Sequence, residues 1–312
     1  MSENSTVATL IVAFARPENL QLQISQLLQQ KEQIFVFIDK ASENSHYSDL
    51  NQATVKTALD NQKLYPSLIT VKFSEITHGV RNGVPAALKW FAQTAAHDFK
   101  FLVVREDDII IESMNEYYEY LKLCKKELNA KIQIAALLSP YDLMNEKIEK
   151  RKCSLSKYPL TWGWITRTEN ILPLFQPAQN QKTSQKLLQL IKSFLDSPIG
   201  NSYFLSAHIR RNHPNNSAWD GAFCFRFLQN KLLCIIPNKS LITNVGNDQV
   251  RNHDFAMGNH DVNLLNTPSN IPLEAELDLS AKSRFETEKM IEREVYQFKL
   301  RHLFSPIKAV LD

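Results

Sequence analysis

Glycine is scarce in this chain, with seven in 312 residues. Loops that bind the phosphates of a dinucleotide or of ATP need clustered glycines, because backbone amides must approach the phosphate closely. Neither the GxGxxG pattern nor the GxxxxGK[ST] pattern occurs in the sequence. If a phosphorylated ligand binds, another group must hold its charge, and carboxylates that bind a divalent cation would serve.

Cysteine pairs, net charge and long apolar runs are also limited. The four cysteines lie far apart without a CxxC spacing, which makes a zinc site or a disulfide framework unexpected. The net charge of +3 and the absence of a long Lys/Arg run argue against a nucleic-acid partner. The N-terminal MSENSTVATLIVAF resembles neither a signal peptide nor a membrane span of roughly 20 residues. We therefore expect a cytoplasmic protein.

Apolar runs rich in β-branched residues recur through the first half and alternate with helix-like segments. The runs cover residues 7–14, 34–38, 68–73, 100–105 and 132–138. This alternation predicts an α/β fold with a mostly parallel sheet flanked by helices. Pro17 and the following PENLQLQISQLLQQ indicate the first helix.

The alternation weakens after about residue 140. We expect a basic loop at KIEKRKCSLSKYP, an amphipathic helix at QKTSQKLLQLIKSFL, strands at LLCIIP and LITNV, and a closing helix at AKSRFETEKMIEREVYQFKLRHLF. Residues 1–140 then form one half of a domain and residues 141–312 a mixed second half that completes its site. The basic and aromatic residues of FKLRHLFSPIKAV suit either packing on the body or peripheral contact with an anionic inner-membrane surface.

Three adjacent carboxylates interrupt the apolar stretch VVREDDIII at residues 103–111. Alternate side chains of a strand share a face, so Glu106 and Asp108 are expected on one side and Asp107 on the other. Two such carboxylates suit Mg²⁺ or Mn²⁺. The alternative is a solvated turn that leads into a helix, whose start is indicated by a capping box of Ser113 and Glu116.

Several motifs occur in an order that resembles the GT-A class of nucleotide-sugar glycosyltransferases. They are AFARPE, VFIDK, ITHGVRNGVPAALKWF, the EDD triplet, TWGWIT and SAWDGAF, and their order and approximate spacing hold from about residue 7 to 255. Specifically, the chain resembles the N-acetylglucosaminyltransferase I family and its bacterial relatives. This resemblance implies a GT-A (Rossmann-like) fold.

The resemblance also implies roles for residues near the nucleotide. Arg16, Asp39 and His78 would contact the nucleotide, with Asp39 and His78 at the uracil. Each has a plainer alternative: a solvated residue at a helix start, a loop aspartate that caps the next segment, and a surface or turn histidine.

Within the triplet, the resemblance assigns Asp108 as the metal ligand and Glu106 and Asp107 as contacts of the sugar and ribose. The metal would be Mn²⁺ or Mg²⁺.

Two tryptophan segments have similar alternatives. Trp164 in TWGWIT either lines the sugar site or packs in the core. Trp219 would also contact the donor, and the adjacent Asp220 is matched to the catalytic base of the family. Because GAFCFRFLQN is helix-like, Asp220 is also suited to be a helix N-cap, and both roles are compatible.

Late in the chain, Arg251 and His253 follow a predicted strand and a glycine. They either neutralise the diphosphate of the donor, as a loop of the family does, or belong to an ordinary polar surface loop.

Together these features predict a metal-dependent, inverting glycosyltransferase of the hexosyltransferase class. Its partners would be a UDP-sugar donor and a glycan or lipid-linked glycan acceptor, with a bacterial surface polysaccharide or lipooligosaccharide as the expected acceptor. The alternatives are a retaining transferase, a nucleotidyltransferase, or a catalytically silent nucleotide- or glycan-binding module of the same fold.

Overall fold

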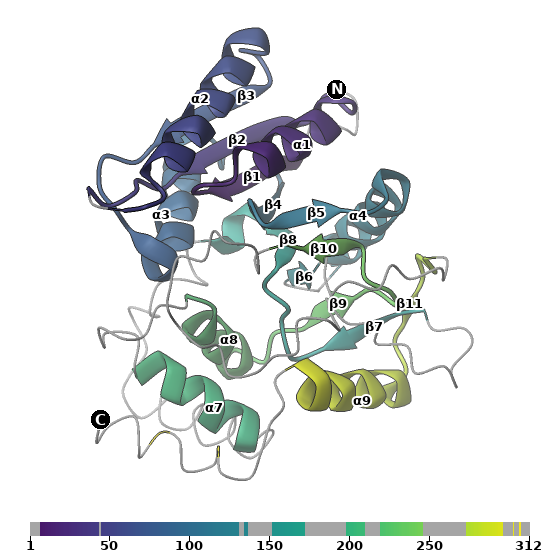
Figure 1. The fold of residues 1–312 in the computed structure, drawn as a ribbon. Coiled ribbons are helices and arrows are strands. Elements are labelled where there is room, and N and C mark those ends of the chain that lie inside the picture. The colour runs from purple at the N-terminus through teal and green to yellow at the C-terminus, as the bar shows by residue number, and fades with distance from the viewer. Residues whose placement is uncertain are drawn as a thin grey trace.

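A large mixed sheet organises the protein. The computed structural model describes residues 7–43, 45–130, 134–136, 152–171, 198–209, 219–245 and 273–295, together with residues 302 and 306. In this part of the chain nine strands form the sheet, in the order β11-β7-β9-β6-β8-β4-β1-β2-β3 (Figure 1). Their bounds are β1 Val7–Ala13, β2 Gln33–Ile38, β3 Ile69–Phe73, β4 Phe101–Glu106, β6 Ile134–Ala136, β7 Cys153–Ser156, β8 Gly163–Arg167, β9 Cys234–Ile236 and β11 Leu277–Asp278. A separate antiparallel pair joins β5 (Ile109–Ile111) to β10 (Ile242–Asn244).

The sheet is mostly parallel, as the first half of the sequence predicts. β1 lies between β2 and β4 and pairs with both in parallel, and β3 extends this unit. The antiparallel β8 then joins β4 to β6. Because β1, β2 and β4 are buried on both faces, they are apolar almost throughout rather than alternating.

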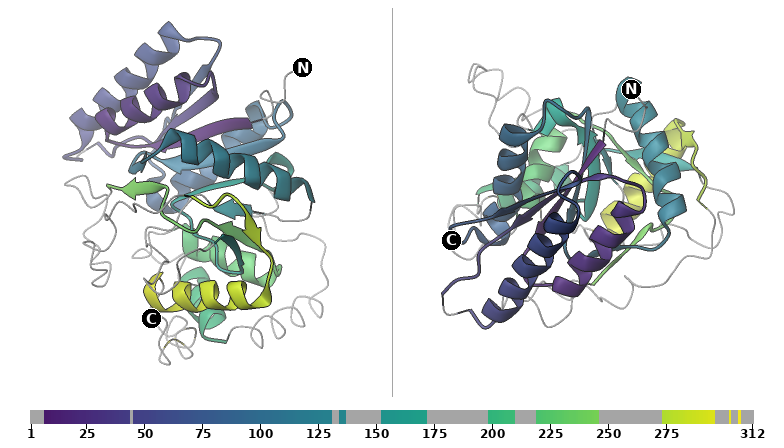
Figure 2. Two further views of the ribbon diagram at one scale, coloured as in Figure 1. Left: turned by 90° about the vertical axis from the view of Figure 1, so that its right-hand side faces the viewer. Right: turned by 90° about the horizontal axis from the view of Figure 1, so that it is seen from above.

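Helices cover both faces of the sheet (Figure 2). The described helices are α1 Pro17–Leu28, α2 Ser48–Leu64, α3 Gly79–Thr94, α4 Met114–Ala130, α7 Pro198–Ile209, α8 Asp220–Gln229 and α9 Ala281–Met290, which continues as a π-helical segment, Ile291–Val295. Side chains of α3 and α8 pack on one face, and those of α1, α2 and α4 on the other. None of the helices described is both long enough and apolar enough to cross a membrane.

One local prediction needs correction. The segment predicted as a basic loop contains strand β7, which pairs with β9 and β11. Its pairing partners lie far away in the sequence, so the short CSLS has no strong local signal. The predicted amphipathic helix at residues 181–195 lies outside the described residues.

The predicted capping box forms only in part. The backbone amide of Glu116 donates to Ser113 Oγ at 3.4 Å. However, the Glu116 carboxylate accepts from Lys239 Nζ at 2.9 Å and from the amide of Leu273 at 3.1 Å. Glu116 therefore connects α4 to later parts of the chain instead of closing the box.

Candidate functional site

The carboxyl ends of β1, β2 and β4 meet at one edge of the sheet, which brings three predicted positions together. The amide of Asp39, after β2, donates to the carbonyl of Ala13 at 2.9 Å, and the amide of Asp107, after β4, donates to the carbonyl of Val12 at 3.0 Å. Arg16 follows β1 at the same edge. Ligands of open α/β sheets bind at this edge, so these residues are well placed for a site.

Two buried amide side chains, which sequence reasoning missed, hold the strand ends in place. Asn51 Nδ2 donates to the carbonyl oxygens of Phe14 at 2.6 Å and Asp39 at 2.8 Å. Gln23 Nε2 donates to the carbonyl oxygen of Glu106 at 3.1 Å. Asparagine and glutamine inside ordinary helices carry no distinctive pattern, so sequence alone could not identify them.

Asp107 joins the end of β4 to the loop after β1. Its Oδ2 accepts from the amide of Phe14 at 2.7 Å and its Oδ1 accepts from Arg16 Nη1 at 3.0 Å. Burial raises the pKa of the Asp107 carboxyl, and the positive charge of Arg16 opposes that rise. Through these contacts Asp107 holds the Arg16 side chain and the loop after β1 in place.

Glu106 and Asp108 lie on either side of Asp107, where β4 ends and a turn leads to β5. Burial raises the pKa of Glu106 well above its ordinary value, and the negative charges of Asp108, Asp107 and Asp220 raise it further, in that order. Strand β4 ends at Glu106, and Asp107 and Asp108 form the turn, so the alternation of a strand does not extend to Asp108.

Trp219 and Asp220 reach this acidic turn from far along the chain. The Trp219 side chain hydrogen-bonds to Glu106 and opposes the rise in its pKa. Asp220 is the first residue of α8, and its Oδ1 accepts from the amide of Gly221 at 2.8 Å. The N-cap position itself is taken by Trp219, and burial raises the pKa of Asp220. Glu106, Asp107, Asp108 and Asp220 are called the acidic cluster below.

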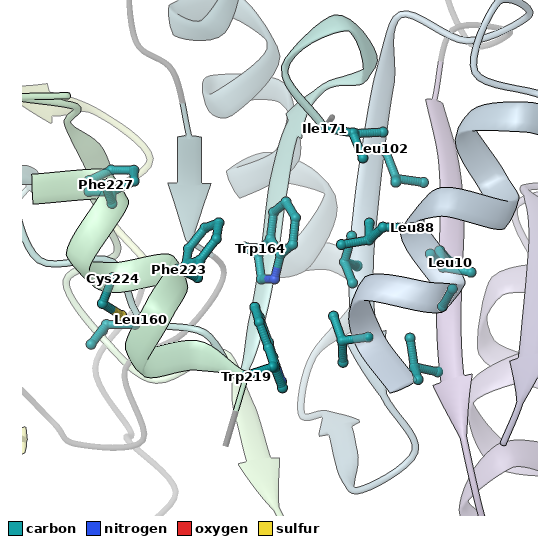
Figure 3. Packing of buried hydrophobic residues seen from close by; sticks show 14 of the residues in the cluster. Leu10, Leu88, Leu102, Leu160, Trp164, Ile171, Trp219, Phe223, Cys224 and Phe227 are labelled. Carbon is teal, nitrogen blue, oxygen red and sulfur yellow. The ribbon is translucent and has the colours of Figure 1, made fainter. Parts of the chain in front are cut away.

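Aromatic packing fixes this junction (Figure 3). The Trp219 ring lies 5.6 Å from the Phe223 ring, which lies 5.5 Å from the Trp164 ring. Trp164 is 1% exposed and belongs to the core between α8 and α3. Of its two predicted roles the structure gives Trp164 core packing, because so little of its surface can meet a sugar.

Asp39 binds the start of α3. Its Oδ1 accepts from the amides of Lys40 at 3.0 Å and His78 at 2.9 Å, and its Oδ2 accepts from Gly79 at 2.7 Å. Asp39 therefore satisfies amides at the N-terminus of α3, far along the chain, and does not simply cap the segment that follows it, which is its plainer alternative. His78 is half-buried, with its ring 6.0 Å from that of Phe37. The result is that Asp39 positions His78 at the same sheet edge.

Tyr203 of α7 is a neighbour of Asp220 that sequence reasoning missed. Burial is the main cause that raises the pKa of its phenol. Electrostatic interactions with Asp220 and then with Cys224 of α8 raise this pKa further. One tyrosine among nine, in a segment without a recognisable motif, gives no signal.

A divalent cation fits this cluster only with help from a ligand. Among the residues that the structure describes, no three His, Cys, Asp or Glu side chains are grouped so that they could hold a metal ion. However, the mutual repulsion that raises the pKa of Glu106 is the effect a cation would relieve. Mg²⁺ in particular often binds through one or two carboxylates and the phosphates of a substrate. Asp108, on the turn, suits such a shared site.

Arg251 and His253 lie outside the described residues. The described segment before them ends at Val245, whose amide donates to the carbonyl oxygen of Asp108 at 2.8 Å. No family model matches the sequence, and no curated protein matches it significantly.

The acidic cluster should cost stability at neutral pH. Because the pKa of Glu106 in the fold lies above its ordinary value of 4.5, folding becomes less favourable as the pH rises through that raised pKa. Glu106→Gln removes the charge and keeps an oxygen for Trp219. We expect its free energy of unfolding at pH 7 to exceed that of the wild type by about 1 kcal/mol, because a buried carboxylate among like charges is disfavoured.

Urea denaturation at several pH values tests this expectation. The gain should shrink as the pH falls toward 4.5. The matched control is Glu119→Gln, an exposed position on α4, which should change stability by less than about 0.5 kcal/mol. A loss of stability in Glu106→Gln at pH 7 would show that the carboxylate is well compensated.

Proposed function

We propose that the protein is a metal-dependent glycosyltransferase of GT-A architecture, which moves a sugar from a UDP-sugar to a hydroxyl group of a glycan with inversion of the anomeric carbon. The main support is one observation: Trp219 and Asp220, from the second half of the chain, lie against Glu106 at the sheet edge where β1, β2 and β4 end. Such an edge is where α/β proteins bind ligands.

The parallel unit of β1 to β4 supplies the donor side of the proposed site. Asp107 and Asp39 hold Arg16 and His78 through the hydrogen bonds described above. Arg16 suits an anionic ligand, and the His78 ring beside Phe37 suits the flat face of a base. Asp108 would hold Mn²⁺ or Mg²⁺, whose charge would stabilise the departing diphosphate.

Asp220 is the proposed general base. It accepts the proton of the acceptor hydroxyl while that oxygen forms a bond to the anomeric carbon. The bond from this carbon to the UDP oxygen breaks, and UDP leaves with the electron pair. Attack from the face opposite UDP produces inversion. Burial raises the pKa of Asp220, which makes its carboxylate a stronger base than an exposed aspartate.

Metal-dependent binding of UDP tests the donor assignment. We expect UDP with Mn²⁺ to raise the melting temperature of the wild type, and Asp108→Ala to weaken this metal-dependent binding by about tenfold or more, or about 1.4 kcal/mol. Titration calorimetry with and without Mn²⁺ measures the change. Asp98→Ala is the matched control, because the Asp98 side chain is 60% exposed.

Several outcomes would contradict the proposal. If the affinity for UDP changes neither with Mn²⁺ nor in Asp108→Ala, the proposed donor site is contradicted. Release of pyrophosphate instead of UDP would identify a nucleotidyltransferase, and a product with the original anomeric configuration would identify a retaining enzyme. Tight binding of a UDP-sugar with no UDP release, with or without an acceptor, would indicate a catalytically silent module.

A further inference from the structure

Helices α7 and α8 pack against each other (Figure 1), and α8 begins at Asp220. A Cβ atom added to Gly221 of α8 would lie 2.5 Å from the Cβ of Ala207 of α7. The backbones of α7 and α8 can come this close together because Gly221 has no side chain. The position of α7 is therefore closely coupled to the helix start that carries Asp220.

The helix pair also brings Tyr203 near the proposed base. Tyr203 lies four residues before Ala207, so the two side chains share one face of α7. Asp220 and Cys224 are likewise four residues apart on α8, and both act electrostatically on the Tyr203 phenol. The body of the ring is held at the same time, with the Phe204 ring at 5.2 Å and the His302 ring at 5.1 Å.

Asp220 interacts with residues from both halves of the chain. Glu106 belongs to β4 and interacts with Asp220 and Trp219 where the strand ends meet. Tyr203 comes from α7 in the second half of the chain and is half-buried. In the proposed reaction an acceptor hydroxyl must reach Asp220, and the Tyr203 phenol, which is protonated at neutral pH, can donate a hydrogen bond.

We propose that Tyr203 is an acceptor-specificity residue, whose phenol donates a hydrogen bond to an oxygen of the acceptor sugar next to the hydroxyl that Asp220 deprotonates. This inference depends on the function proposed above. The class of ligand is a pyranoside with a free hydroxyl beside the reacting one.

Tyr203→Phe tests the inference, because it removes the O–H and keeps the packed ring. The probes are methyl glycosides of common hexoses at high concentration, with the UDP-sugar that the wild type binds. We expect the KM for the best glycoside to rise about 3- to 10-fold, the equivalent of one hydrogen bond of roughly 1 kcal/mol. The kcat and the slow UDP release without acceptor should not change. The control is Tyr65→Phe, at an exposed tyrosine after α2.

The possible results separate this inference from the proposed function. Absence of UDP release from every UDP-sugar, with or without acceptor, contradicts the proposed function itself. UDP release with an unchanged KM in Tyr203→Phe overturns the inference alone. A fall in kcat and in acceptor-free UDP release also overturns it, because Tyr203 would then position Asp220. Finally, no stimulation of the wild type by any glycoside would contradict a sugar subsite beside Tyr203.

Discussion

Replacing Asp220 with asparagine is expected to reduce sugar transfer by about 100- to 10,000-fold, the usual contribution of a general base. Asparagine has nearly the same shape, and its side-chain oxygen can still accept from the Gly221 amide. However, it cannot take up the acceptor proton at neutral pH. Affinity for UDP with Mn²⁺ should stay within about threefold of the wild type, because the change concerns the transition state. Transfer rates and titration calorimetry on the same preparations measure both quantities.

The control for this variant is Asp98→Asn, which makes the same chemical change at an exposed side chain. Asp220→Asn should not lower the free energy of unfolding, because it removes a buried charge whose pKa is raised by burial. If Asp220→Asn keeps full transfer, Asp220 serves α8 as a terminal residue and the base is another group. If Asp220→Asn also loses its affinity for UDP, Asp220 takes part in binding the donor.

Gly221→Ala should disturb the same residue through packing. The added methyl group would lie 2.5 Å from Ala207 Cβ, closer than two carbon atoms can approach, so α8 must move away from α7. Overpacking of this kind costs about 1–3 kcal/mol, and the better helix propensity of alanine offsets roughly 1 kcal/mol of it. The start of α8 carries Asp220, and a displacement of about 1 Å near reacting groups can lower a rate roughly 100-fold. We therefore expect the rate of sugar transfer to fall roughly 100-fold, while the free energy of unfolding falls only by the difference between the two opposing effects.

A second change on α7 is designed to reverse this effect. In the double variant Gly221→Ala and Ala207→Gly, the new methyl group faces the Cα of residue 207 at 3.8 Å, an ordinary contact. The gain and loss of helix propensity then nearly cancel. Transfer should return to within about threefold of the wild type, as expected for directly coupled positions. A single Gly221→Ala variant with normal activity, or a double variant without recovery, would contradict the coupling of α7 to Asp220.

Local patterns predicted the first half of the fold well. The apolar runs at residues 7–14, 34–38, 68–73 and 100–105 all form strands, and the helix expected from Pro17 forms α1. These strands are buried on both faces, so their composition carries the signal by itself. By contrast, β7 and α7 were not predicted, because a four-residue strand depends on distant partners and α7 has apolar and polar residues on all sides.

By itself the sequence determined which residues stand at strand ends, because strands, turns and helix starts depend on neighbours along the chain. It placed Arg16, Asp39 and the acidic triplet after β-runs, and the structure brings these ends to one edge. Tertiary structure alone decided the rest: that Trp164 is core, that Asp39 and Asp107 bind backbone amides, and that Asp220 meets Glu106 with Tyr203 beside it. Such contacts join segments up to about a hundred residues apart, and packing among whole elements, rather than local periodicity, selects them.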